Sequence, residues 1–123
     1  PEIISKEPLG PAVRHGDNQW SDLVRWTFNA LLIAEEKGIT KANIEEVAAS
    51  STDPEVRRML GLEGDMGKML GVDNDAFKRA IAAVGNYGES FERNLGMNSP
   101  MKLQRGPNAL WTEGGLQYSP PFR

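Results

Sequence analysis

The segment from Gly85 to Gly96 places the strongest local constraint on the fold, because glycines bracket a short amphipathic run. Glycine tolerates the left-handed backbone that ends many helices, so Gly85 is expected to end one helix and Gly96 the next. Between them Tyr87, Phe91 and Leu95 recur every fourth residue and therefore share one helical face. This pattern predicts a short helix packed on a core, which by itself indicates no function.

A longer helix is predicted from Asn18 or Gln19 to Lys37. Asp17 is suited to cap its first turn, and Gly38 follows the last basic residue as a C-terminal stop. A wide apolar surface runs along it, formed by Trp20, Leu23, Val24, Phe28 and Leu31 with Trp26, Ala30 and Ile33 on the flank. Such a helix needs cover on more than one side, so part of this surface is expected to remain open in an isolated chain. A homodimer through this surface, or through exchanged N-terminal segments, is one hypothesis.

Shorter helices are predicted between and after these two. Their expected ranges are Thr40 or Asn43 to Ala49, Pro54 to about Leu60, and Asp73 or Asn74 to Val84, with a brief turn expected from Asp65 through Leu70. Asp53-Pro54 places a capping residue directly before a proline at the first helical position, which is a typical helix start. The isolated chain is therefore expected to be mainly α.

Prolines interrupt both ends of the chain. In residues 1–17 the short β-prone pieces Ile3-Ile4 and Ala12-Val13 predict one or two short β-strands, confined to an edge by the neighbouring prolines. Beyond Met97 no periodicity remains, which predicts an extended tail. Its apolar anchors are expected to be Trp111, Leu116, Tyr118 and Phe122.

Composition excludes several classes of protein. At 123 residues one domain is expected. The net charge of −3 argues against a nucleic-acid partner, because such binding depends on Lys and Arg neutralising phosphates. The absence of cysteine excludes disulfides, thiol nucleophiles and thiolate metal sites. No run approaches the roughly 20 apolar residues that span a bilayer.

A glycine-rich loop carries the most suggestive motif, yet it does not fit a phosphate loop. Five residues separate Gly61 from the Gly67-Lys68 pair, where a phosphate loop has four, and Met69 stands where Ser or Thr would bind magnesium. We interpret it as a loop between helices.

The remaining candidate chemistry is also absent. His15, the only histidine, lacks neighbouring groups for metal binding or catalysis and is interpreted as a turn residue. Glu35-Glu36 and Glu45-Glu46 are adjacent pairs whose side chains diverge along a helix, so they are expected on solvated faces. Trp20 and Trp26 are expected in a core rather than in a ligand cage. No catalytic, ligand-binding or metal residue and no cofactor is assigned, and the chain is not expected to be an enzyme.

Several segments resemble the amino-acid-binding proteins of ABC transporters. They are Lys6-Glu7-Pro8-Leu9-Gly10-Pro11-Ala12-Val13-Arg14-His15-Gly16-Asp17, the Gly85-Asn86-Tyr87 turn, Asn98-Ser99-Pro100-Met101-Lys102-Leu103, Arg105-Gly106, Asn108-Ala109-Leu110-Trp111-Thr112 and Gly114-Gly115-Leu116-Gln117-Tyr118. The similarity runs from about Ile4 to Arg123. The chain resembles the C-terminal part of proteins in the general L-amino-acid-binding branch. That branch belongs to solute-binding protein family 3 and the type II periplasmic binding proteins.

The resemblance implies the C-terminal portion of a two-lobed α/β fold. Residues 1–17 would form the return strand and turn from the second lobe, 18–96 the helical segment completing the first lobe, and 97–123 an extended tail. No signal peptide is present in this chain, and the family's signal and pocket residues are expected upstream of Pro1. The resemblance also implies a periplasmic location. The implied partners are an ABC permease and the remaining lobes of the same protein, and L-amino acids would be bound only by the intact protein. The alternative from the pattern alone is a stand-alone helical protein-interaction or structural domain.

Overall fold

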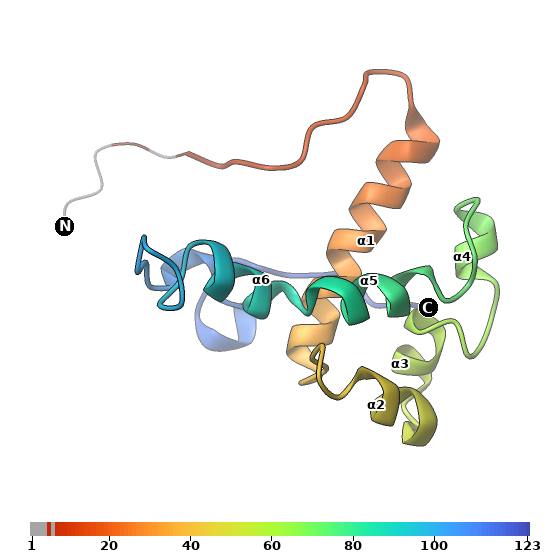
Figure 1. Cartoon of the computed structure of the whole chain (residues 1–123). Helices are drawn as coiled ribbons and strands as arrows, with labels where there is room; N and C mark the ends of the chain where they lie inside the picture. The colour runs from red at the N-terminus through yellow and green to blue at the C-terminus, as the bar shows by residue number, and fades with distance from the viewer. Residues whose placement is uncertain (1–4, 6) are drawn as a thin grey trace.

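The computed structural model describes residue 5 and residues 7–123 and is mainly helical there. The elements in chain order are α1 (Asn18–Glu36), α2 (Ile44–Ser50), α3 (Pro54–Met59), α4 (Met66–Met69), α5 (Ala76–Val84), α6 (Tyr87–Asn94) and the short 3-10 turns η1 (Gly106–Asn108) and η2 (Trp111–Glu113). Helices α5 and α6 pack across α1, and the tail returns behind them to end near α3 and α5 (Figure 1). The predicted helical class is confirmed.

The one or two expected short strands do not form in the described residues. Ala12 and Val13 belong to a segment without regular structure that leads away from the start of α1 (Figure 1), while Ile3-Ile4 lies outside the described residues. A strand needs a neighbouring strand to pair its backbone groups, and within the described range only one isolated parallel bridge forms, between Leu110 and Gln117. Ala12-Val13 therefore has no ladder partner within the described residues.

Local capping explains why several helices begin where the sequence predicts. The Asp17 carboxylate accepts a hydrogen bond from the backbone N–H of Trp20 at 3.1 Å, and that of Asp53 accepts from Glu55 at 2.9 Å. At the start of α6, Asn86 and Glu89 form a reciprocal capping box, with both side chain to backbone hydrogen bonds at 2.9 Å. These contacts satisfy amide donors that the first helical turn leaves unpaired.

The two ends of the Gly85 to Gly96 segment behave differently. Gly85 ends α5 with φ of +81°, as expected for a glycine stop. The left-handed end expected at Gly96 is wrong, because α6 ends at Asn94 and Gly96 has no positive φ. Instead the Gly96 N–H donates to the Phe91 carbonyl at 2.8 Å, and the chain leaves α6 without a residue in the left-handed conformation at Gly96.

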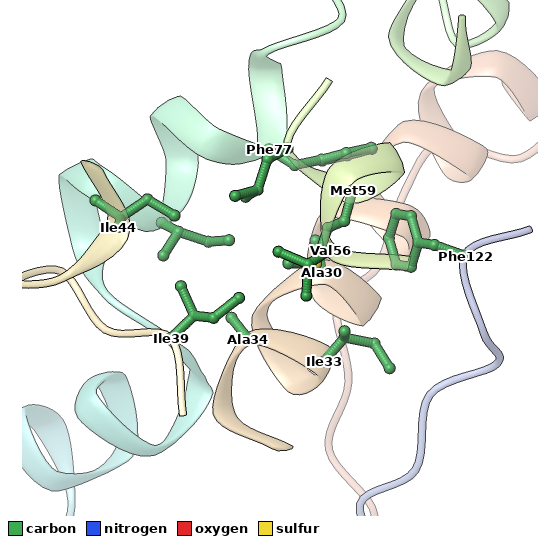
Figure 2. Packing of buried hydrophobic residues seen from close by; sticks show 11 residues of the cluster. Ala30, Ile33, Ala34, Ile39, Ile44, Val56, Met59, Phe77 and Phe122 are labelled. Atoms are coloured by element: carbon green, nitrogen blue, oxygen red, sulfur yellow. The ribbon is translucent and has the colours of Figure 1, made fainter. Parts of the chain in front are cut away.

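The core is formed by the C-terminal half of α1 with the elements that follow it. Its members are Ala30, Ile33, Ala34, Ile39, Ile44, Val56, Met59, Leu60, Phe77, Ile81 and Phe122. Figure 2 shows Phe122, on the C-terminal tail, lying beside Val56 and Met59. The side chains expected on the flank of the long helix, Ala30 and Ile33, thus provide its core contacts.

The expected burial of Trp20 is wrong, while Trp26 packs partly buried against the core. Trp20 is 53% exposed, since the face of α1 that carries it has little cover in this chain. Of the four expected tail anchors only Phe122 is buried, and Trp111 and Tyr118 instead contact each other with ring centroids 5.9 Å apart. Leu116 is fully on the surface at 78% exposure.

Arg105 attaches the middle of the tail to α1. Its guanidinium forms a two-pronged ion pair with Glu35, with N–O distances of 2.7 and 3.2 Å. The same group lies over the rings of Tyr87 and Phe91, 5.4 and 5.2 Å from their centroids. Both charged side chains are largely buried, at 18% and 13% exposure. The expectation that Glu35 lies on a solvated face is therefore wrong.

Substitution of Gly61 by alanine is expected to destabilise the fold more than the same change at Gly64. Both glycines have a positive φ, +75° and +72°, which costs an alanine about 1 kcal/mol. A Cβ at Gly61 would also overlap the backbone of Asn74, whereas one at Gly64 has open space. We expect urea unfolding to give a loss of about 1 kcal/mol for G64A and about 3 kcal/mol for G61A. Equal losses would show that the Asn74 contact is unimportant.

Replacement of Arg105 by alanine is expected to lower the free energy of unfolding by about 3 kcal/mol, because it leaves the largely buried Glu35 carboxylate without its partner. The matched control is R25A. Arg25 pairs with Asp22 at 3.8 Å, with both side chains more than half exposed, so its loss should cost less than about 0.5 kcal/mol. Urea unfolding of the two variants measures the difference, and a similar loss for both would contradict the anchoring role.

Candidate functional site

An open apolar groove along the N-terminal half of α1 is the most distinctive surface of the chain. It has a volume of ≈ 450 Å³ and is lined by Trp20, Leu23, Val24, Thr27, Phe28, Leu31, Val72 and Ala76. Six of these side chains come from successive turns of α1, and the other two close the groove from the segment before α5 and from the first residue of α5. The predicted apolar stripe of the long helix therefore forms a surface rather than the core.

The groove offers no charged group to a small ligand. Its only hydroxyl, on Thr27, donates to the Leu23 carbonyl at 2.8 Å and so is already hydrogen-bonded within α1. Ligand pockets for polar molecules place a few polar groups to fix orientation, and an amino acid needs partners for both its carboxylate and its ammonium. The chemistry of the groove instead fits an apolar protein surface.

A larger hollow beside α3 contains charged groups that are already engaged. It has a volume of ≈ 620 Å³ and is lined by Thr52, Pro54, Arg57, Arg58, Glu63 and Gly64. The Arg57 side chain pairs with Glu63 at 3.4 Å, and the Arg58 Nε donates to the Phe122 carbonyl at 3.1 Å. The two arginines therefore serve contacts within the chain.

The motifs singled out in the sequence lie apart from one another. His15 is exposed in the turn before α1. In the glycine-rich loop, the Lys68 side chain pairs with Asp65 at 3.0 Å, and its backbone N–H donates to the Asn74 side chain at 3.1 Å. A phosphate loop would point these groups at a ligand, so the interpretation as a loop between helices fits this geometry.

Glu45 and Glu36 occupy ordinary surface positions. Glu45 pairs with Lys78 at 2.7 Å, and Glu36 accepts a long hydrogen bond of 3.4 Å from the indole N–H of Trp111. Across residue 5 and residues 7–123, no group of three or more His, Asp or Glu side chains is arranged to hold a metal ion. Over the same span, every helix is too short or too polar to cross a membrane.

Three pKa shifts mark local structural contacts. The hydrogen bond to Asp53 raises the pKa of the Lys37 side chain, and the same bond lowers the pKa of the Asp53 carboxyl. Burial raises the pKa of the Tyr87 hydroxyl, and the nearby Arg105 charge partly opposes that effect. Each group lies at a junction between elements, so these shifts belong to packing contacts rather than to a reactive centre.

The sequence analysis did not predict which distant residues would line the groove or pair with Glu35. Val72 and Ala76 complete the groove, and Arg105 reaches Glu35 across 70 positions of the chain. The only sequence signal for Arg105 was its place in the Arg105-Gly106 motif of the family resemblance.

Comparison with known proteins gives matches to binding proteins over the whole of this chain, although no protein-family model matches it. The glutamate/glutamine/aspartate/asparagine-binding protein BztA of Rhodobacter capsulatus is 70% identical over 123 residues, covering 100% of this chain and 36% of the relative. The general L-amino acid-binding periplasmic protein AapJ of Rhizobium johnstonii is 58% identical over 100% of this chain and 36% of its own length.

A solved structure agrees with these relatives. An ABC transporter periplasmic binding protein from Brucella ovis with glutathione bound superposes with a TM-score of 0.94 at 57% identity, over 100% of this chain and 39% of the other. The present chain thus spans about a third of the length of the curated relatives that it matches. Over its whole length the chain is therefore similar to the matching third of proteins that are named as periplasmic amino-acid-binding proteins of ABC transporters.

Proposed function

We propose that this chain is part of an ABC-transporter binding protein that captures L-amino acids in the periplasm and delivers them to a membrane permease. The main support for the proposal is the 70% identity to the Rhodobacter capsulatus protein over the whole of this chain. That relative is named for binding glutamate, glutamine, aspartate and asparagine, so acidic amino acids and their amides are the first ligands to test. The role is one of binding and transport, without catalysis.

Within the longer protein, we assign residues 1–17 to the return from the second lobe, 18–96 to the helices completing the first lobe, and 97–123 to the tail. The fold is consistent with this division, because residues 7–17 lead away from α1 without regular structure and the tail packs back on the helices (Figure 1). The groove on α1 then faces the rest of the first lobe. An apolar, uncharged surface of this kind is what an intramolecular core interface requires.

The amino-acid pocket itself is proposed to lie in the part of the protein that this chain does not contain. Neither the groove nor the hollow beside α3 presents a paired donor and acceptor set for an amino acid. The groove lacks charged groups, and in the hollow Arg57 and Arg58 are held by Glu63 and the Phe122 carbonyl. Closure of two lobes by a hinge would then create the pocket in the complete protein.

The test is a calorimetric titration of glutamate into this chain and into a chimera. In the chimera, the chain replaces the matching third of the Rhodobacter capsulatus protein. We expect no saturable heat from the chain alone and saturable binding by the chimera, with the unaltered relative as a positive control. Saturable heat from the chain alone would contradict the pocket assignment and would favour a stand-alone binding domain. A folded chimera that does not bind, beside a relative that does, would contradict the proposed function.

A second prediction tests the orientation of the groove. Leu23→Asp places a charge in the groove, so it should destabilise the chimera by at least about 3 kcal/mol, since the charge would be buried against the rest of the lobe. In the isolated chain, where Leu23 borders an open surface, the cost should stay within about 1 kcal/mol. Ala42→Asp, at an exposed turn position, is the control in both proteins. Equal costs of L23D in the two proteins, measured by urea unfolding, would show that the groove stays open.

A further inference from the structure

The core of this chain is built only from the residues that follow the middle of α1, although its members are widely spaced along that part of the sequence. Every member of the buried cluster falls between Ala30 and Phe122. By contrast, none of the described residues before Asn29 is buried. The division runs through the middle of α1, so one helix carries both a packed half and an open half.

Phe122 completes that core from the C-terminal tail. Its side chain has 0% exposure and meets Trp26 and Phe77 edge to face, with centroids 5.1 and 5.7 Å apart. In proteins generally, an aromatic pair in this geometry contributes about 0.5–1.5 kcal/mol of stability beyond that from burying its surface area. The two contacts therefore favour a fixed position for the Phe122 ring.

The backbone of Phe122 is also held on both sides. Its N–H donates to the Glu55 carboxylate at 3.0 Å, and its carbonyl accepts from the Arg58 Nε at 3.1 Å. Both partners lie on α3, so this short helix fixes the last residues of the tail. Arg105 fixes the middle of the tail on Glu35, near the end of α1.

From these contacts we infer that residues 26–122 form a helical unit that folds without the remainder of the binding protein, and that the tail acts as its clasp. Arg105 and Phe122 are the two attachment points. A stretch of this length is large enough to bury a core of its own. The N-terminal half of α1 lies outside the unit, because its apolar face needs cover that this unit does not provide. The inference concerns the isolated chain and does not depend on which ligand the longer protein binds.

Amide hydrogen exchange and thermal unfolding of the 123-residue chain test the inference directly. We expect one cooperative unfolding transition by circular dichroism. Amides of Leu32–Ala34, α3 and α5 should exchange slowly as one group, and those in the first turns of α1 should exchange at least about tenfold faster. Absence of a cooperative transition, or uniformly fast exchange, would overturn the inference.

Variants in the tail test the clasp. Phe122→Ala should lower the unfolding midpoint by at least about 10 °C, because it removes a fully buried aromatic side chain. Leu116→Ala, at a tail position that is 78% exposed, is the matched control and should stay within about 2 °C of the parent. If Phe122→Ala fails to fold, Phe122→Leu serves in its place. It keeps most of the apolar volume and should lower the unfolding midpoint by less. A parent-like midpoint for either Phe122 variant would overturn the clasp.

Variants on α1 test the boundary of the unit. Ile33→Ala, at a position with 3% exposure, should lower the midpoint by at least about 8 °C. Trp20→Ala, on the open half of the same helix, should change it by less than about 3 °C, despite the loss of a larger side chain. Similar losses from the two variants would place the whole of α1 inside the unit and would overturn the boundary.

Discussion

Helix α1 is apolar over more of its circumference than this chain can cover, and most of the structure follows from that constraint. Its C-terminal half packs against α5 and α6 and receives the tail, while its N-terminal half presents a groove lined almost wholly by apolar side chains. A helix with two apolar faces belongs between two layers of structure. One layer is present here, and the relatives are nearly three times as long as this chain, which is room for the second.

The parts of the fold that depend on neighbouring residues could be predicted from the sequence. Asp17 and Asp53 were predicted to cap two helices, and each accepts a hydrogen bond from an amide two or three positions ahead, a contact visible in a local window. The cap at Asn86 was not predicted. Strands could not be predicted in the same way, because Ala12-Val13 is β-prone but has no partner to pair with. The left-handed end expected at Gly96 was wrong for a related reason, since other backbone contacts after α6 replaced the glycine stop.

The choice between core and surface depended on distant residues and was harder to predict. Helical spacing places Trp20 and Leu23 together but does not say which face another element will cover. Phe122 and Arg105 decide it by returning to α1 from the tail. Glu35 shows the same limit, because its burial depends on a partner 70 positions later. For the site, the sequence patterns led us to expect no phosphate or metal site, whereas the family resemblance rested on matched segments rather than on spacing.

If the longer protein closes two lobes by a hinge, as proposed above, a clasped helical unit has a mechanical consequence for it. Hinge motion moves lobes as rigid bodies, so each lobe must keep its internal packing while the connections between lobes bend. In this chain the tail ties α1 and α3 together through charged and aromatic contacts that are mostly buried. Because interiors packed at this density resist continuous deformation, a lobe built on this unit would transmit the hinge rotation rather than absorb it. On the proposed hinge mechanism, residues 7–17, which have no regular structure, are then a better place to look for the bending connection than the helices.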